Sequence, residues 1–172
     1  MKILQFSTFM ILSTFLIGKT WVSPSNKEAG MPNWNVNSIS KQQIEVTFEL
    51  DGYFIEELRD GKNRITFPGS VPLLIEGAPE LPLIAKSIVI PNLAHMELKV
   101  IATEFTDYSV DNIAPSKGNL TRNIDPETIS YNYGIPYSED SFFPKDIAYL
   151  RDPYIMRSVR GQTIVFQPIQ YN

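Results

Sequence analysis

The sequence contains no cysteine and a single histidine, His95, among its 172 residues. Without cysteine, the chain has no disulfide, no thiolate metal ligand and no thiol nucleophile. Zinc sites usually need several His or Cys ligands, so one histidine excludes the common kinds. A catalytic triad would depend on His95 alone, and the sequence has no Gly-x-Ser-x-Gly motif to accompany it. We therefore expect His95 to be a surface or capping residue, and the chain to be no enzyme and to hold no cofactor or metal.

Other ligand and catalytic motifs are also missing. The sequence has no glycine-rich phosphate loop. Glu139, Asp140 and Asp146 lack the spacing of a calcium-binding loop, which indicates a solvated acidic face. A carboxylate pair for glycoside hydrolysis is defined by distance in space, and none of the 19 Asp and Glu residues stands out by sequence.

The N-terminal segment has the pattern of a secretory signal peptide. Lys2 supplies a positive charge, and a mainly apolar run from Ile3 to Ile17 follows it. This run is shorter than the ~20 residues that a membrane-spanning helix needs. We expect residues 1–25 to be the signal peptide, with small residues near the cleavage site in Ser23-Pro24-Ser25, and an uncleaved N-terminal anchor as the alternative. The protein is then secreted, into the periplasm or the extracellular space.

The chain has few positive charges for its size. Fifteen Lys and Arg residues stand against 19 Asp and Glu, a net charge of −4. Loss of residues 1–25 removes Lys2 and Lys19, which leaves 13 positive against 19 negative residues and a net charge of −6. An acidic domain without a basic stripe is a poor partner for nucleic acid or an anionic membrane surface.

Proline and alternating hydrophobicity predict an all-β fold. Thirteen prolines spread along the chain leave little room for long helices. Residues 43–50 alternate strictly between polar and apolar side chains, which is typical of a half-buried strand. Further strands are expected at 53–58, 64–67, 86–90, 96–105 (with a bulge at Ile101), 155–160 and 163–169, with turns that include 160–162.

Many short strands with turn signals between them favour an antiparallel β-sandwich that resembles a jelly roll. We expect it to cover residues 43–172, with residues 26–42 as a linker or loosely docked arm and residues 112–125 as a long loop or exposed hairpin.

An ordered series of motifs resembles the N-terminal propeptide of gingipain-type cysteine peptidases. The likeness extends from about Gln43 to Asn172. Its members are Gly77-x-Pro79-x-Leu81-Pro82, Ile113-Ala114-Pro115-Ser116-Lys117-Gly118, Arg122, Asp125-Pro126, Tyr131-x-Tyr133-Gly134, Phe142-Phe143-Pro144, Asp152-Pro153, Val159-Arg160-Gly161-Gln162 and Pro168-x-Gln170-Tyr171-Asn172.

This resemblance implies a non-catalytic propeptide that assists the folding of a secreted cysteine endopeptidase and keeps it latent by blocking its active-site cleft. Because the family's peptidases cut after Arg or Lys, their specificity pocket must offer an acidic partner. Arg122 lies where the inhibitory arginine of the family falls, and Lys117, next to Gly118, is the second choice. A solvated loop position for Arg122 is the alternative.

In the family the propeptide continues with at least one further strand, so the resemblance implies that the domain at residues 43–172 is C-terminally incomplete. Its partner, a cognate cysteine peptidase domain, would then be inhibited in trans. Another class of function stays open: a β-sandwich binding module for carbohydrate or a surface partner, with Tyr131, Tyr133 and Tyr137 as an aromatic platform. A third interpretation is a decayed gene product that folds poorly.

Overall fold

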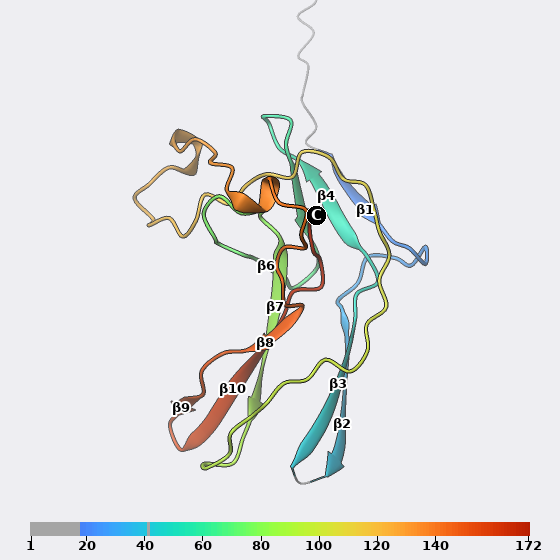
Figure 1. Cartoon of the computed structure of the whole chain (residues 1–172), viewed down its shortest axis with the longest axis vertical. Helices are drawn as coiled ribbons and strands as arrows, with labels where there is room; N and C mark the ends of the chain where they lie inside the picture. Colours follow the sequence, from blue (N-terminus) through green and yellow to red (C-terminus); the bar gives the residue numbers. More distant parts are fainter. Residues whose placement is uncertain (1–17, 41) are drawn as a thin grey trace, which may run out of the picture.

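The protein is built from antiparallel strands in three sheets (Figure 1). The structure, a computed structural model, describes residues 18–40 and 42–172. The apolar run of the expected signal peptide, residues 3–17, lies outside the described residues. Every pairing between the named strands is antiparallel. The expected all-β antiparallel fold is confirmed, and the jelly-roll-like order of strands stays a prediction.

The largest sheet has the order β6-β7-β10-β8, with β9 paired to the other end of β10. A second sheet has the order β1-β4-β5, and β2 pairs with β3 as a hairpin. The strands are β1 (Lys19–Val22), β2 (Asn33–Ser40), β3 (Gln43–Glu49), β4 (Tyr53–Glu57), β5 (Asn63–Thr66), β6 (Val71–Pro72), β7 (Pro82–Val89), β8 (Ala148–Leu150), β9 (Tyr154–Met156) and β10 (Val159–Phe166). Two short 3₁₀ helices, η1 (Pro126–Thr128) and η2 (Ile135–Tyr137), lie between β7 and β8.

The core lies where these sheets meet. Its buried members are Tyr53, Ile65, Phe67, Leu81, Ile84 and Ile113. An aromatic cluster joins the β2–β3 hairpin to β10, because the Trp34 ring lies 4.9 Å from that of Phe48 and 4.8 Å from that of Phe166. Burial of such rings is the main stabilising contribution available to a chain without disulfides.

The expected linker at residues 26–42 contains a strand. β2 pairs with β3 from Asn33, opposite Glu49, to Ser40, opposite Gln43. The polar residues of this segment suggested a linker, yet they occupy the solvent-exposed positions of a hairpin, and Trp34 attaches it to the core. The expected signal peptide also ends within ordered structure, since β1 pairs with β4. Where the signal is cleaved stays a prediction.

Two further expectations differ from the structure. Residues 96–105 form no strand, because no described backbone pairs with them, and several of their apolar side chains are exposed. The turn expected at 160–162 lies earlier, at Arg157-Ser158, and Arg160 to Gln162 belong to β10. Gly161 is required there for packing rather than for a turn, since a Cβ would lie 2.8 Å from the Tyr154 ring.

Candidate functional site

The candidate site is a long loop whose two ends are fixed to the same core segment. We call residues 117–133 the Arg122 loop. It follows Ser116, which is 1% exposed and donates its amide to the Ala78 carbonyl at 2.7 Å. The Gly77 amide donates to the Ser116 carbonyl at 3.0 Å, and the Gly134 amide donates to the Gly77 carbonyl at 2.7 Å. The loop therefore leaves and re-enters the body at one place, and Figure 1 shows it projecting beyond the sheets.

Arg122 lies in a tight turn of this loop. The Ile124 amide donates to the Thr121 carbonyl at 3.0 Å, which makes Arg122 the second residue of a β-turn. Gly118 has φ +78°, a left-handed conformation that suits glycine, where the loop begins. Arg122 is exposed, and its guanidinium has no hydrogen bond or ion pair within the described ranges 18–40 and 42–172. The turn thus presents a positive charge to solvent.

The return half of the loop is held by helix η1. An Asp125 carboxylate oxygen accepts the Glu127 amide at 2.9 Å, and Pro126 occupies the first turn, where a missing N–H costs nothing. Arg59 and Glu127 form an ion pair at 3.5 Å with both side chains 79% exposed, so it contributes little.

Lys117 is engaged within the protein, unlike Arg122. Its ammonium donates to the Pro126 carbonyl at 2.7 Å and lies 4.3 Å from the centre of the Tyr131 ring. Lys62 lies 4.7 Å from the centre of the same ring. These partners could not be found from the sequence, because nine residues separate Lys117 from Pro126 and no local pattern marks a cation–π contact.

Two of the three tyrosines of the alternative hypothesis, Tyr133 and Tyr137, pack against each other, and Tyr137 also packs against Tyr171. The Tyr133 and Tyr137 rings meet at 71° and those of Tyr137 and Tyr171 at 56°. The Tyr137 hydroxyl donates to the Ile113 carbonyl at 2.9 Å. Burial, and next the neighbouring Tyr171, raise the pKa of Tyr137, and burial also raises the pKa of Tyr131. Tyr133 is 51% exposed, but its ring stands at a steep angle to that of Tyr137, so the two rings do not form a flat platform.

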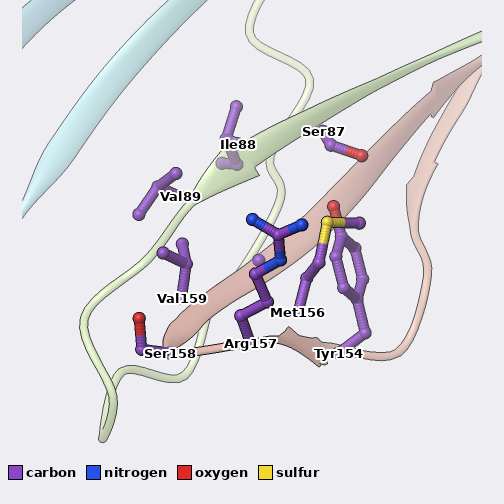
Figure 2. Close-up of a pocket in the computed structure, with 9 residues that line it drawn as sticks. Ser87, Ile88, Val89, Tyr154, Met156, Arg157, Ser158 and Val159 are labelled. Atoms are coloured by element: carbon purple, nitrogen blue, oxygen red, sulfur yellow. The ribbon is translucent and has the colours of Figure 1, made fainter.

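A second surface feature is an open groove of about 550 Å³ at the far end of the β7–β10 sheet. Figure 2 shows Tyr154, Met156 and Arg157 on one side of the groove and Ile88 and Val89 of β7 on the other. Most of the side chains that line the groove are apolar or aromatic, Val89 among them is 77% exposed, and Arg157 is the charged member. No carboxylate, histidine or cysteine lines it, so it offers a contact surface rather than catalytic groups.

Features that suggested other chemistry are spread over the surface. His95 is exposed in the extended segment after β7. Across residues 18–40 and 42–172, no group of three or more His, Asp or Glu side chains is arranged to hold a metal ion. In the same part of the chain, no helix is long and apolar enough to cross a membrane.

Comparison with solved structures finds the same fold in gingipain prodomains. The complex of the RgpB pro- and mature domains from Porphyromonas gingivalis matches with a TM-score of 0.72 and 35% identity, over 83% of this chain and 76% of that chain. A structure described as giving insight into the zymogenic latency of gingipain K, from the same organism, matches with a TM-score of 0.75. That match covers 90% of this chain and 88% of the other at 21% identity, so it supports the fold alone.

The curated relatives are much longer than this chain. Gingipain R1 of P. gingivalis is 34% identical over 176 residues, which span 100% of this chain and 18% of the relative. Gingipain R2 is 33% identical over 96% of this chain and 23% of its own length. The model of the Propeptide_C25 family matches residues 25–172. The chain therefore belongs to the Propeptide_C25 family, the propeptides of gingipain-type cysteine peptidases.

Proposed function

We propose that this chain is an exported propeptide that binds a gingipain-type cysteine peptidase domain, assists its folding and keeps it latent by inserting Arg122 into the specificity pocket. The observation that carries the proposal is the state of Arg122. Its guanidinium is solvent-exposed, lacks a partner within the described residues and lies in a turn of a loop anchored at both ends. A side chain held out in this way loses less conformational entropy on binding than one on a mobile segment.

The chemistry of the guanidinium fits such a pocket. A peptidase that cleaves after arginine must offer a carboxylate or equivalent acceptors, and a guanidinium binds a carboxylate through two parallel hydrogen bonds. The neighbouring cation, Lys117, is already bound to the Pro126 carbonyl and the Tyr131 ring. Arg122 is therefore the better-placed plug of the two.

The relatives support a peptidase as the partner. One matching structure is a complex of a prodomain with its mature domain. A propeptide tethered to its peptidase gains from a high effective concentration. When the purified domain is added to the peptidase as a separate molecule it lacks this gain, so we expect its inhibition to depend on its concentration.

The test is inhibition of an Arg-specific gingipain-type peptidase by the purified chain and its Arg122→Ala variant. We expect the variant to inhibit at least about tenfold more weakly, since a charged hydrogen bond to a buried carboxylate is worth about 1.5–3 kcal/mol. Arg151→Ala is the matched control, because Arg151 is also exposed but follows β8, outside the loop. No inhibition by a chain whose circular dichroism and cooperative unfolding show it to be folded would contradict the latency role.

A second candidate function belongs to the groove of Figure 2. Its apolar lining and open form suit contact with a surface partner, as a binding module would need. This function makes a different prediction, because substitution at Met156 would weaken partner binding whereas substitution at Arg122 would not.

A further inference from the structure

We infer that Lys117 is a positioning residue, which clamps the two halves of the Arg122 loop together and so holds Arg122 in its presenting turn. This inference rests on the proposed function. It assigns Lys117 a role other than that of an alternative plug for the specificity pocket.

The first half of the clamp is a hydrogen bond across the loop. Lys117 is the first residue of the loop, and its ammonium donates to the carbonyl of Pro126 at 2.7 Å. Pro126 begins helix η1, whose end is fixed by the Asp125 carboxylate. The bond therefore joins the two ends of the segment 117–126, which contains Arg122. It links the start of the loop to helix η1.

The second half of the clamp is the Tyr131 ring. The Lys117 and Lys62 ammonium groups lie 4.3 and 4.7 Å from its centre. Lys62 belongs to the β4–β5 turn, where it also pairs with Asp60 at 3.2 Å. Through Tyr131 the loop therefore contacts the turn between β4 and β5, in the β1-β4-β5 sheet. A cation over an aromatic face is attracted by the negative charge of the ring face.

The geometry separates the tasks of the two cations. The Lys117 side chain has its acceptor and its aromatic partner inside the protein, and leaving them would abandon both contacts. Arg122 has neither kind of partner in the described part of the chain, and its turn is closed by the Ile124 amide and the Thr121 carbonyl. Loss of the clamp would leave Arg122 intact but would allow the turn to move relative to the body of the protein.

A loose loop has a second consequence for an inhibitor that offers arginine to an arginine-specific peptidase. A held loop occupies the cleft without adapting to the catalytic geometry, whereas a mobile loop is cut as a substrate. Loosening the clamp should therefore weaken inhibition and speed cleavage after Arg122 together.

The experiment compares the full chain with Lys117→Met, Lys117→Arg, Arg122→Ala and the double variant Lys117→Met/Arg122→Ala. Methionine keeps the length of the side chain without its charge, and arginine keeps both the donor and the cation. The readouts are the inhibition constant, the rate of cleavage after Arg122, and amide hydrogen exchange of residues 119–125 without peptidase. Urea unfolding checks that each variant is folded.

We expect Lys117→Met to inhibit about tenfold more weakly, to be cut faster after Arg122 and to exchange its loop amides faster, since it loses both the hydrogen bond and the cation–π interaction of Lys117. Lys117→Arg should stay within about threefold of the wild-type chain, as both interactions survive the change. The double variant should be no weaker than Arg122→Ala alone, because positioning has no value once the positioned side chain is gone.

Unchanged inhibition and unchanged loop exchange in Lys117→Met would overturn the inference. So would an Arg122→Ala variant that inhibits fully until Lys117 is also replaced, since Lys117 would then be the plug. If the wild-type chain does not inhibit, the proposed function fails, and the amide exchange of Lys117→Met alone decides whether the clamp exists.

Discussion

The amide of Gly134 donates a hydrogen bond to the carbonyl of Gly77 at 2.7 Å, so the returning end of the Arg122 loop touches the segment from which its first end departs. Neither residue has room for a side chain. A Cβ on Gly134 would lie 3.0 Å from the Gly77 carbonyl oxygen. A Cβ on Gly77 would lie 3.3 Å from the Gly134 nitrogen, and Gly77 also has φ +79°, which disfavours any other residue. Two glycines, distant in sequence, form the base of the loop.

Replacing Gly134 with alanine should open this base. We expect a loss of about 1–3 kcal/mol in the free energy of unfolding, from the close contact with the Gly77 backbone. Urea unfolding of the variant measures it, and Gly30→Ala is the matched control, since neither glycine has a positive φ and a Cβ on Gly30 would meet only the Glu28 carbonyl oxygen, at 3.9 Å. If Gly134→Ala is as stable as the wild-type chain, the prediction is wrong, and the Gly77 backbone can move to make room for the added methyl group.

The guanidinium of Arg122 should matter beyond its charge. In Arg122→Lys the positive charge remains, but the paired hydrogen bonds to a carboxylate are lost. Against an Arg-specific peptidase we expect inhibition about tenfold weaker than that of the wild-type chain, with an unchanged unfolding midpoint. Equal inhibition constants for the two chains would mean that charge alone is recognised.

The β2–β3 hairpin should depend on Trp34. Its ring contacts Phe48 within the hairpin and Phe166 of β10, so truncation removes the link between them. We expect Trp34→Ala to lower the free energy of unfolding by about 2–4 kcal/mol. Val36→Ala is the control, since Val36 lies on the same strand but is 57% exposed. If the free energy of unfolding falls equally little in both variants, the hairpin is not attached through its aromatic residues.

Alkaline pH should destabilise the fold through Tyr137. Burial raises the pKa of this phenol above its ordinary value of 10.0. The folded chain therefore keeps the proton at a pH where the unfolded chain releases it, so stability is complete below pH 10 and falls as the pH rises above it.

The comparison of unfolding free energies at pH 8 and at about pH 10.5 tests this effect. At pH 8 the unfolding free energy of Tyr137→Phe should be about 1 kcal/mol lower than that of the wild-type chain, because the hydrogen bond to the Ile113 carbonyl is lost. Above pH 8 the unfolding free energy of the variant should fall less steeply than that of the wild-type chain. An identical pH dependence in both chains would assign the effect to other tyrosines.

Local sequence patterns predicted the strands that pair with their neighbours along the chain. Strict alternation at residues 43–50 predicted β3, and the strands expected at 53–58 and 64–67 agree with β4 and β5 to within one residue at each end. Alternation failed at residues 96–105, because a strand also needs a partner backbone, and the pattern does not say whether one is near. The same limit applies to β2, whose polar residues do not predict a strand. Its Trp34 packs on Phe166 of β10, which lies far away in the sequence.

The inhibitory role of the candidate site stays a prediction. Motif resemblance indicated Lys117, Gly118 and Arg122, and the structure places all three in one loop. It did not separate the tasks of the two cations, since that separation depends on the Pro126 carbonyl and the Tyr131 ring, which reach Lys117 only in the folded chain. The closure of the loop base by Gly77 and Gly134 likewise needed the three-dimensional structure.

The most direct test of the central claim is competition for the specificity pocket itself. The measurement is the dissociation constant of the purified chain for an Arg-specific gingipain-type peptidase, before and after its catalytic cysteine is alkylated with an arginine chloromethyl ketone, which fills the pocket. We predict that labelling weakens wild-type binding by at least about tenfold and leaves the weaker binding of Arg122→Ala unchanged. Wild-type binding of equal strength to the free and the labelled peptidase would contradict the claim that Arg122 occupies the pocket.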